Sequence, residues 1–537
     1  MNRLYYGDNL PILREHIADE SVDLVYLDPP FNSNATYNVL FKAPSGEGSR
    51  AQIEAFEDTW HWNDSAEDAY WQVLKGQNSD AARMLEAMRG FLGENDMMAY
   101  LAMMAVRLIE LHRVLKPTGS LYLHCDPTAS HYLKILLDAI FGKQQFRNEI
   151  VWKRNNSHNS GKRFGRIHDV IFYYTKSKKW TWNWTFTEFS AQQLSRYEED
   201  EEGRLYKAEN LTAERKNSSS GKFEWRGTTP GPTRGWAHTL EQLEEWWTQG
   251  LILKKKDGTP RLDGLKVYLE DLEGAKAQSI WTDIPRVANI SEERLGYDTQ
   301  KPVALLERII SASSNEGDIV LDPFCGCGTT VHAAQKLGRR WIGIDVTHLA
   351  ISLIERRLRE AFPGIRFETI GVPRDLAAAR DLALRNKHEF QKWAITLIPD
   401  AQPWKGGRKG ADTGIDGIVY LRTGKNQSHR AIIEVKGGEH VGVDVVHKLK
   451  SVVEREKALV GILIALNPPS AQAEKEAVSA GYEEIDMGTG SARFRKIQIL
   501  TIEELMTGAR ANLPIIDNTA FRKAKRESDA KQDELDL

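Results

Sequence analysis

The chain has 537 residues, of which 41% are hydrophobic, and this length predicts about two to four domains. Its charge is nearly balanced, with 72 Lys and Arg against 75 Asp and Glu. This excludes a uniformly basic nucleic-acid-binding protein, so any basic surface must be local. Three cysteines are too few for a disulfide framework and suggest a reducing cytosol. We find no apolar run of about 18 residues and no signal-peptide pattern, so we expect a cytoplasmic, nucleoid-associated protein with no membrane partner.

The first feature is a strand that ends in a stiff corner. Residues 22–27 (VDLVYL) are typical of a buried strand, and Asp28, Pro29, Pro30 and Phe31 follow. The strand must stop there because proline cannot donate to a ladder. Open α/β sheets bind ligands at this end of their strands. A carboxylate, proline carbonyls and a flat ring suit a planar base that carries an amine; the alternative is a plain proline turn.

The residues around this corner predict an α/β domain. Apolar spacing predicts helices over 9–16, 97–114 and 130–141. Strands are expected at 120–125 and 169–174, and the polar stretch 42–95 is expected to form short helices or loop. This alternation indicates a mostly parallel sheet with helices on both faces.

Residues 151–282 differ in composition, because nine of the fifteen tryptophans lie there. The basic residues at its start are Lys153, Arg154, Lys162, Arg163 and Arg166. Basic side chains interleaved with aromatics and flexible loops favour contact with DNA grooves and phosphates. The alternative is that the tryptophans form a core and the charges a solvated face.

A second ligand-binding pattern follows the insert. A helix over 300–313 leads to a strand at 318–321, then to the loop Asp322-Pro323-Phe324-Cys325-Gly326-Cys327-Gly328, a helix from 331, and a strand over 340–344 that ends at Asp345. Such a unit binds nucleosides, since the glycines allow close backbone approach and the acid can take two ribose hydroxyls. The loop is not GxGxxG and no phosphate-loop lysine follows, so phosphates are not required. The two cysteines lack the neighbours that a zinc site needs.

Together, the two halves resemble the amino-methylating DNA methyltransferases that use S-adenosylmethionine. The order DPPF, Trp-rich insert and FCGCG loop is similar to the circularly permuted beta group, and the helix QKPVALLERII precedes the loop as it does there. The resemblance covers about residues 1–365. It implies a Rossmann-like methyltransferase sheet over 1–375 with a target-recognition region inserted at about 176–282.

The resemblance also implies roles for single residues. Cofactor contacts would come from Asp8 near the adenine ring, Asp345 on the ribose, Lys301 and Pro302 over the methionine end, and the loop residues Asp322, Pro323, Phe324, Gly326 and Gly328. The target base would meet Asp28, Pro29, Pro30 and Phe31. Asp28 would accept one amine N–H, the Pro29 carbonyl the other, and Phe31 would stack on the base. Aspartate at the first position favours adenine N6; serine is more common in the cytosine-N4 branch, which is the alternative.

The C-terminal part, over 381–510, carries a different pattern. Asp416 precedes a strand at 418–421, and the strand at 431–435 contains Glu434 and runs into Lys436. This is the D…ExK layout of nucleases that hold Mg²⁺ between two carboxylates, with the lysine orienting water. Glu389, on a helix predicted over 387–397, is a candidate further ligand. The residue pattern GxDG…EVKGG resembles that of Mrr-like restriction endonuclease domains. We expect the tail over 516–537 to be disordered.

The sequence therefore predicts a site-specific adenine-N6 DNA methyltransferase fused to a Mg²⁺-dependent endonuclease domain, as in restriction–modification. Double-stranded DNA is the expected partner, and a homodimer is one option because relatives of this group are often dimers. Three alternatives stay open. The enzyme could modify cytosine N4, its methyltransferase half could be only a sensor in a DNA-binding nuclease, or its C-terminal domain could only grip DNA.

Overall fold

The computed structural model describes residues 1–29, 36–39, 53–57, 61–155, 162, 164–165, 167–215, 221–288, 291, 293–295, 300–404, 414–422, 428–486 and 491–514. These residues divide into two units. The main unit comprises Met1–Asn183 and the described residues from Ser279 onward, and the inserted unit comprises Trp184–Gln278.

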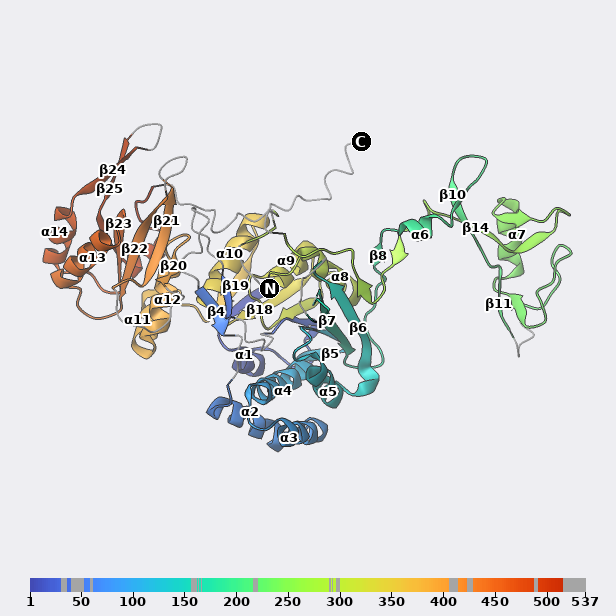
Figure 1. Cartoon of the computed structure of the whole chain (residues 1–537), viewed down its shortest axis with the longest axis horizontal. Helices are drawn as coiled ribbons and strands as arrows, with labels where there is room; N and C mark the ends of the chain where they lie inside the picture. The colour runs from blue at the N-terminus through green and yellow to red at the C-terminus, as the bar shows by residue number, and fades with distance from the viewer. Residues whose placement is uncertain are drawn as a thin grey trace. The chain divides into compact units, whose positions relative to one another are not determined.

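A nine-stranded sheet is the centre of the main unit (Figure 1), in the order β16-β6-β7-β5-β2-β17-β18-β1-β19. Its strands are β1 (Asn2–Tyr6), β2 (Val22–Leu27), β5 (Leu115–Cys125), β6 (Phe146–Lys153), β7 (His168–Thr175), β16 (Ile280–Trp281), β17 (Ile319–Asp322), β18 (Arg340–Asp345) and β19 (Phe367–Ile370). All pairs are parallel except those of β7, which runs antiparallel to β5 and β6. The sheet is therefore mostly parallel, as expected.

Strand β2 is buried along its whole length because helices cover both faces of the sheet. Val25 and Leu27 face one core, and Leu24 and Tyr26 face the other. The first core packs α1 (Asn9–His16), α2 (Asp64–Lys75), α3 (Ser79–Leu92), α4 (Asp96–Val114) and α5 (Ser130–Phe141). The second packs α8 (Val303–Ser313), α9 (Thr329–Lys336) and α10 (His348–Ala361). This two-sided burial explains why the strand reads as a continuous apolar run.

The strand order places two loops beside each other. From β2 the chain passes through β3 (Thr36–Val39), β4 (Ile53–Glu57) and helices to β5 on one side, whereas β17 leads to β18 on the other. Strands β2 and β17 are parallel neighbours, with Leu321 opposite Val25. Their carboxyl ends open at the point where the strand order reverses, which is where such sheets bind ligands.

The inserted unit has its own small fold. Its elements are β8 (Phe186–Thr187), α6 (Ala191–Leu194), β9 (Glu198–Glu199), β10 (Leu205–Glu209), β11 (Thr212–Glu214), β12 (Arg234–Trp236), α7 (Leu240–Thr248), β13 (Ile252–Lys254), β14 (Pro260–Tyr268) and β15 (Ala275–Lys276). Trp225 and Trp236 lie in its core, 5.5 Å apart and nearly perpendicular. These two tryptophans are therefore structural, whereas Trp184 is exposed.

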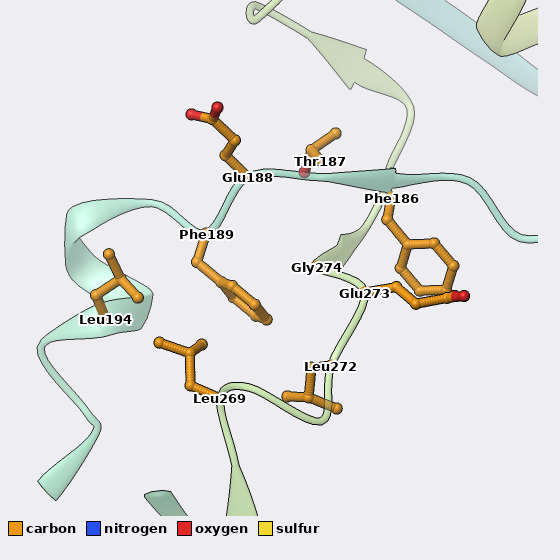
Figure 2. Close-up of a pocket in the computed structure, with 9 residues that line it drawn as sticks. All are labelled: Phe186, Thr187, Glu188, Phe189, Leu194, Leu269, Leu272, Glu273 and Gly274. Atoms are coloured by element: carbon orange, nitrogen blue, oxygen red, sulfur yellow. The ribbon is translucent and has the colours of Figure 1, made fainter. Parts of the chain in front are cut away.

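A shallow cavity of about 610 Å³ lies between β8 and the segment before β15 in this unit (Figure 2). Phenylalanine and leucine side chains line most of it, with Glu188 and Glu273 at its edge. No residue of the predicted sites lines it.

The C-terminal part contains a five-stranded sheet in the order β20-β21-β22-β23-β26. Its strands are β20 (Gln402–Pro403), β21 (Gly417–Arg422), β22 (Ser428–Lys436), β23 (Val460–Ala465) and β26 (Ile497–Thr501), and a ribbon of β24 (Tyr482–Asp486) and β25 (Ser491–Arg495) lies outside it. One core packs α11 (Leu376–Arg385), α12 (Lys387–Thr396) and α15 (Ile502–Met506), and the other packs α13 (Val443–Arg455) and α14 (Ala471–Ser479). The fold is α/β, as expected.

One expectation about an element needs correction, and one strand was not predicted. Strand β5 begins at Leu115 rather than at residue 120. Lys116 forms a 2.8 Å ion pair with Asp23 of β2, which holds the start of β5 against that strand. Strand β6, which opens the basic segment, was not predicted, since its outward side chains are charged. Among the described residues, no helix is both long and apolar enough to span a membrane. The tail over 516–537 lies outside the described residues.

Candidate functional site

The corner after β2 presents a carboxylate with only one oxygen engaged. Asp28 Oδ2 forms an ion pair with the ammonium of Lys301, and the two side chains are 17% and 11% exposed. Asp28 Oδ1 is buried and has no hydrogen-bond partner among the described residues. Pro29 is buried beside it, whereas Pro30 and Phe31 lie outside the described residues. The corner can therefore accept a hydrogen bond from a donor that reaches Oδ1.

The loop after β17 brings a second buried carboxylate to the same edge of the sheet. Asp322 accepts a hydrogen bond from the Phe324 N–H at 2.9 Å. Burial raises the pKa of Asp322 to about 7, and the negative charges of Asp28 and Asp345 contribute to the rise. Gly328 is the N-cap residue just before α9 and has a φ of +76°, and a Cβ there would lie 2.8 Å from the Ile354 side chain. The loop thus needs glycine at this position for both conformation and space.

Asp345, at the end of β18, holds the other side of this loop. Its Oδ2 accepts the Gly326 N–H and its Oδ1 the Thr347 N–H, both at 2.9 Å. Burial raises the pKa of Asp345 to about 6. The Cys325 sulfur packs closely over Gly343, where an added Cβ would lie 2.5 Å from it. The cysteine therefore fills space under the loop.

A network that the sequence did not predict links α1 to this loop. Asn9 Nδ2 donates to the Pro323 carbonyl at 2.8 Å. The buried Arg107 of α4 donates to Asn9 Oδ1 at 2.6 Å and to Asp8 Oδ1 at 2.8 Å. Asp8 also caps α1 through the Leu10 N–H. Asp8 is thus linked to the loop through Arg107 and Asn9. The one signal in the sequence for this network was a charged residue within the apolar pattern of α4.

A buried polar chain, which was also not predicted, runs under the corner across three strands. Tyr26 of β2 lies with its hydroxyl 3.0 Å from His124 Nδ1, and His124 Nε2 lies 3.2 Å from Asp169 Oδ2. Arg154 lies 3.4 Å from the other oxygen of Asp169. Burial raises the pKa of Asp169, but the hydrogen bond and charge of His124 together with the charges of Lys301 and Arg154 outweigh it, so the pKa lies below its usual value.

The predicted DNA-binding residues are only partly described. Lys153 ends β6 and is half-buried, as is Arg154, while Lys162 is exposed. Arg163 and Arg166 lie outside the described residues. Arg154 contacts Asp169, so its charge is partly engaged inside the protein.

The structure brings together the three residues of the C-terminal pattern. Asp416, just before β21, accepts the Val435 N–H of β22 at 2.7 Å. Glu434 of β22 is 1% exposed, and Lys436 Nζ lies 2.8 Å from its Oε1. Burial raises the pKa of Glu434, and the charge of Asp416 adds to the rise. Over the part of the chain that the structure describes, no group of three or more His, Cys, Asp and Glu could hold a metal ion.

The expectation that Glu389 joins this cluster is wrong. Its carboxylate accepts from the Tyr6 hydroxyl at 2.7 Å and from Lys392 at 3.0 Å. The Tyr6 ring stacks on His348 with 3.7 Å between centroids. The helical period explains the difference, because Gln391 faces Asp416, and residues two apart on a helix point in nearly opposite directions.

Residues 22–356, more than half of the chain, match a protein family described as DNA methylase. The chain belongs to this family. Among similar curated proteins, the type II methyltransferase M.EcaI of Enterobacter cloacae is 31% identical over 66% of this chain and 69% of its own length. The StyLTI Mod subunit of Salmonella typhimurium, a type III restriction-modification enzyme, is 27% identical over 63% of this chain and 50% of its own length. The DNA adenine methyltransferase YhdJ of Escherichia coli is 26% identical over 66% of this chain and 82% of its own length.

Two solved structures are similar to this DNA methylase at lower sequence identity. M1.HpyAVI in complex with SAM is 16% identical over 67% of this chain and 99% of that chain, with a TM-score of 0.31. The cytosine-N4-specific PvuII DNA methyltransferase is 14% identical over 68% of this chain and 89% of that chain, with a TM-score of 0.33.

The C-terminal domain matches a second family. Residues 403–506 correspond to a family described as NACHT-associated inactive Restriction Endonuclease 1. This agrees with the endonuclease-like part of the expectation. Because the family is described as inactive, it does not support cleavage by this domain.

Proposed function

We propose that the protein transfers a methyl group from S-adenosylmethionine to N6 of adenine in double-stranded DNA. The observation that carries this proposal is the Asp28 carboxylate. Lys301 holds one of its oxygens, and the other is buried without a partner beside the glycine loop of the cofactor half. An amine N–H of the target base would satisfy that oxygen.

The loop residues fit S-adenosylmethionine, which supplies an electrophilic methyl on a positively charged sulfur. Asp345 would hold the ribose hydroxyls, the backbone at Phe324 and Gly326 would lie under the methionine part, and Asp8 would lie near the adenine ring. Burial is the main cause of the raised pKa values of Asp322 and Asp345, and the charges of Asp28 and Asp345 add to the rise at Asp322. A cationic ligand beside these carboxylates would favour their charged forms.

The chemistry needs only hydrogen bonding and orientation. The lone pair of an aromatic amine is delocalised into the ring, so the amine is a weak nucleophile. Asp28 would accept one N–H and the Pro29 carbonyl the other, which favours a tetrahedral nitrogen with its lone pair directed at the methyl group. The nitrogen–carbon bond would form as the sulfur–carbon bond breaks, and the proton that the amine then loses would pass to Asp28.

Adenine N6 is the favoured target because the corner begins with aspartate. The adenine methyltransferase among the relatives supports this, and cytosine N4 is the alternative that the experiment must exclude. We propose that the inserted unit contacts the DNA. We propose the same for Lys153, Arg154 and Lys162, which belong to the basic segment of the main unit, once the base has left the stack. The names of the type II and type III relatives support a role in restriction–modification.

Incubation with radiolabelled S-adenosylmethionine and mixed-sequence DNA tests the proposal. We expect label in DNA from wild type and none from Asp28→Ala, although the variant still binds the cofactor. Mass spectrometry of the digested DNA should detect N6-methyladenine and no N4-methylcytosine. Label from Asp28→Ala at the wild-type rate would refute the role of Asp28, and cofactor binding without any transfer by wild type would favour a sensor.

A second candidate function is Mg²⁺-dependent DNA cleavage by the C-terminal domain. It is favoured by two carboxylates on adjacent strands, Asp416 and the buried Glu434, with Lys436 beside them. The match to a family described as inactive is evidence against it. Cleavage of methylated or unmethylated DNA by wild type with Mg²⁺, and none by Glu434→Ala, would support it; DNA binding without cleavage would leave a domain that grips DNA.

A further inference from the structure

We infer that Lys301 is a positioning residue for the target amine, because it fixes one oxygen of Asp28 and directs the other toward the base. The motif resemblance instead assigns Lys301 to the methionine end of the cofactor. The inference deepens the proposed function and rests on it.

The contact itself is selective for one oxygen. The ammonium of Lys301 meets Asp28 Oδ2, and Oδ1 of the same carboxylate has no hydrogen-bond partner among the described residues. A carboxylate can rotate about its last bond, and an ion pair on one oxygen removes that freedom. Lys301 therefore leaves the catalytic oxygen in a single direction.

The backbone that carries Lys301 is itself firmly held. Gln300 receives the Leu295 N–H at 2.8 Å and donates to the Glu293 carbonyl at 2.6 Å. The Glu293 carboxylate accepts the Val303 N–H at 2.6 Å, which satisfies the first turn of α8. Pro302, with a φ of −63°, fixes the backbone between Lys301 and the first turn of α8. In the QKP motif, Gln300 and Pro302 thus anchor the chain, and Lys301 supplies the charge.

The surrounding charges explain why a cation is needed at this point. Acidic side chains face this end of the sheet from three further strands: Asp322 from β17, Asp345 from β18 and Asp169 from β7. Further titratable groups here are Tyr26 and His124, which belong to the buried chain described above, together with Arg154, which contacts Asp169, and the buried Cys125. Lys301 contacts Asp28 directly, and its charge also lowers the pKa of Asp169.

Kinetics separate this role from cofactor binding. A lysine that holds only the cofactor would change cofactor affinity, whereas one that orients Asp28 acts on the transfer step. For Lys301→Met, which keeps the length of the side chain and removes the charge, we expect single-turnover methyl transfer at saturating cofactor to slow about 100-fold. The dissociation constant of S-adenosylmethionine should change less than about threefold. Lys301→Arg should recover part of the rate.

Lys496→Met provides the matched control. Lys496 forms a 2.9 Å ion pair with Glu483 in the C-terminal part of the chain, so its loss should leave the transfer rate unchanged. Melting curves of all variants report folding. A Lys301→Met enzyme that binds cofactor at least tenfold more weakly and transfers at the wild-type rate would overturn the inference alone. Absence of transfer by the folded wild type would instead refute the proposed function and, with it, this inference.

Discussion

Replacing Arg107 with methionine is expected to weaken both the fold and the cofactor loop. The change removes hydrogen bonds to Asn9 Oδ1, Asp8 Oδ1 and the Met103 carbonyl, at 2.6, 2.8 and 2.9 Å. At about 1 kcal/mol each they contribute about 3 kcal/mol, and the buried Asn9 oxygen left without a donor costs a further 1–3 kcal/mol or so. Arg107 is buried, and burial lowers the pKa of its guanidinium. Methionine removes the cost of burying this charge, which offsets about 2 kcal/mol of the loss. The net loss in unfolding free energy is about 3 kcal/mol.

Two assays measure this effect. For a domain of this size, we expect the melting temperature to fall by about 5 °C. Because Asn9 also holds the Pro323 carbonyl, calorimetric titration should show S-adenosylmethionine binding weakened about tenfold, which corresponds to about 1.4 kcal/mol. Arg83→Met is the control, since that side chain is 77% exposed and its loss should cost less than about 0.5 kcal/mol. An Arg107→Met protein with wild-type melting and affinity would refute the reasoning.

Three further outcomes are expected. Gly328→Ala should lower the unfolding free energy by about 2 kcal/mol or more. Gly250→Ala is the control and should cost less, because its φ is also positive (+73°) but the space around it is open. Equal losses of both variants in urea unfolding would exclude a clash with Ile354 as a cause. Tyr26→Phe should cost about 1–2 kcal/mol in the same assay because the buried hydrogen bond between the Tyr26 hydroxyl and His124 Nδ1 is lost, and an unchanged midpoint would contradict this. In the folded state the pKa of Asp322 is raised to about 7, so the fold loses stability as pH rises from about 4 through 7. Asp322→Asn should therefore raise the melting temperature more at pH 8 than at pH 5, and an equal change at both would count against it.

The sequence predicted those parts of the site that are local in the chain. The corner at Asp28 and the loop from Asp322 to Gly328 each depend on a strand that ends in residues of fixed conformation, and both lie at the carboxyl ends of neighbouring strands. That the two strands are neighbours could be expected from the family resemblance but not from either motif alone.

Contacts between distant residues could not be predicted in the same way. Tyr26 and His124 are 98 residues apart, as are Asn9 and Arg107, and nothing local indicates which polar side chain will meet which across strands and helices. Glu389 shows the converse limit. Its residue type suited a metal site, but its helical phase directs it toward Tyr6.

The inserted unit begins and ends at one narrow ribbon. Strands β8 and β15 pair there, with Ala275 opposite Thr187, and the Ala277 N–H donates to the Thr185 carbonyl at 2.9 Å. The two ends of the 95-residue unit, Trp184–Gln278, therefore lie close together, as they do in domains that tolerate insertion into a host chain. During evolution, one recombination event with break points in this ribbon could exchange the whole unit and leave every strand of the nine-stranded sheet in place. The same two break points are where an engineer would graft a unit from a relative.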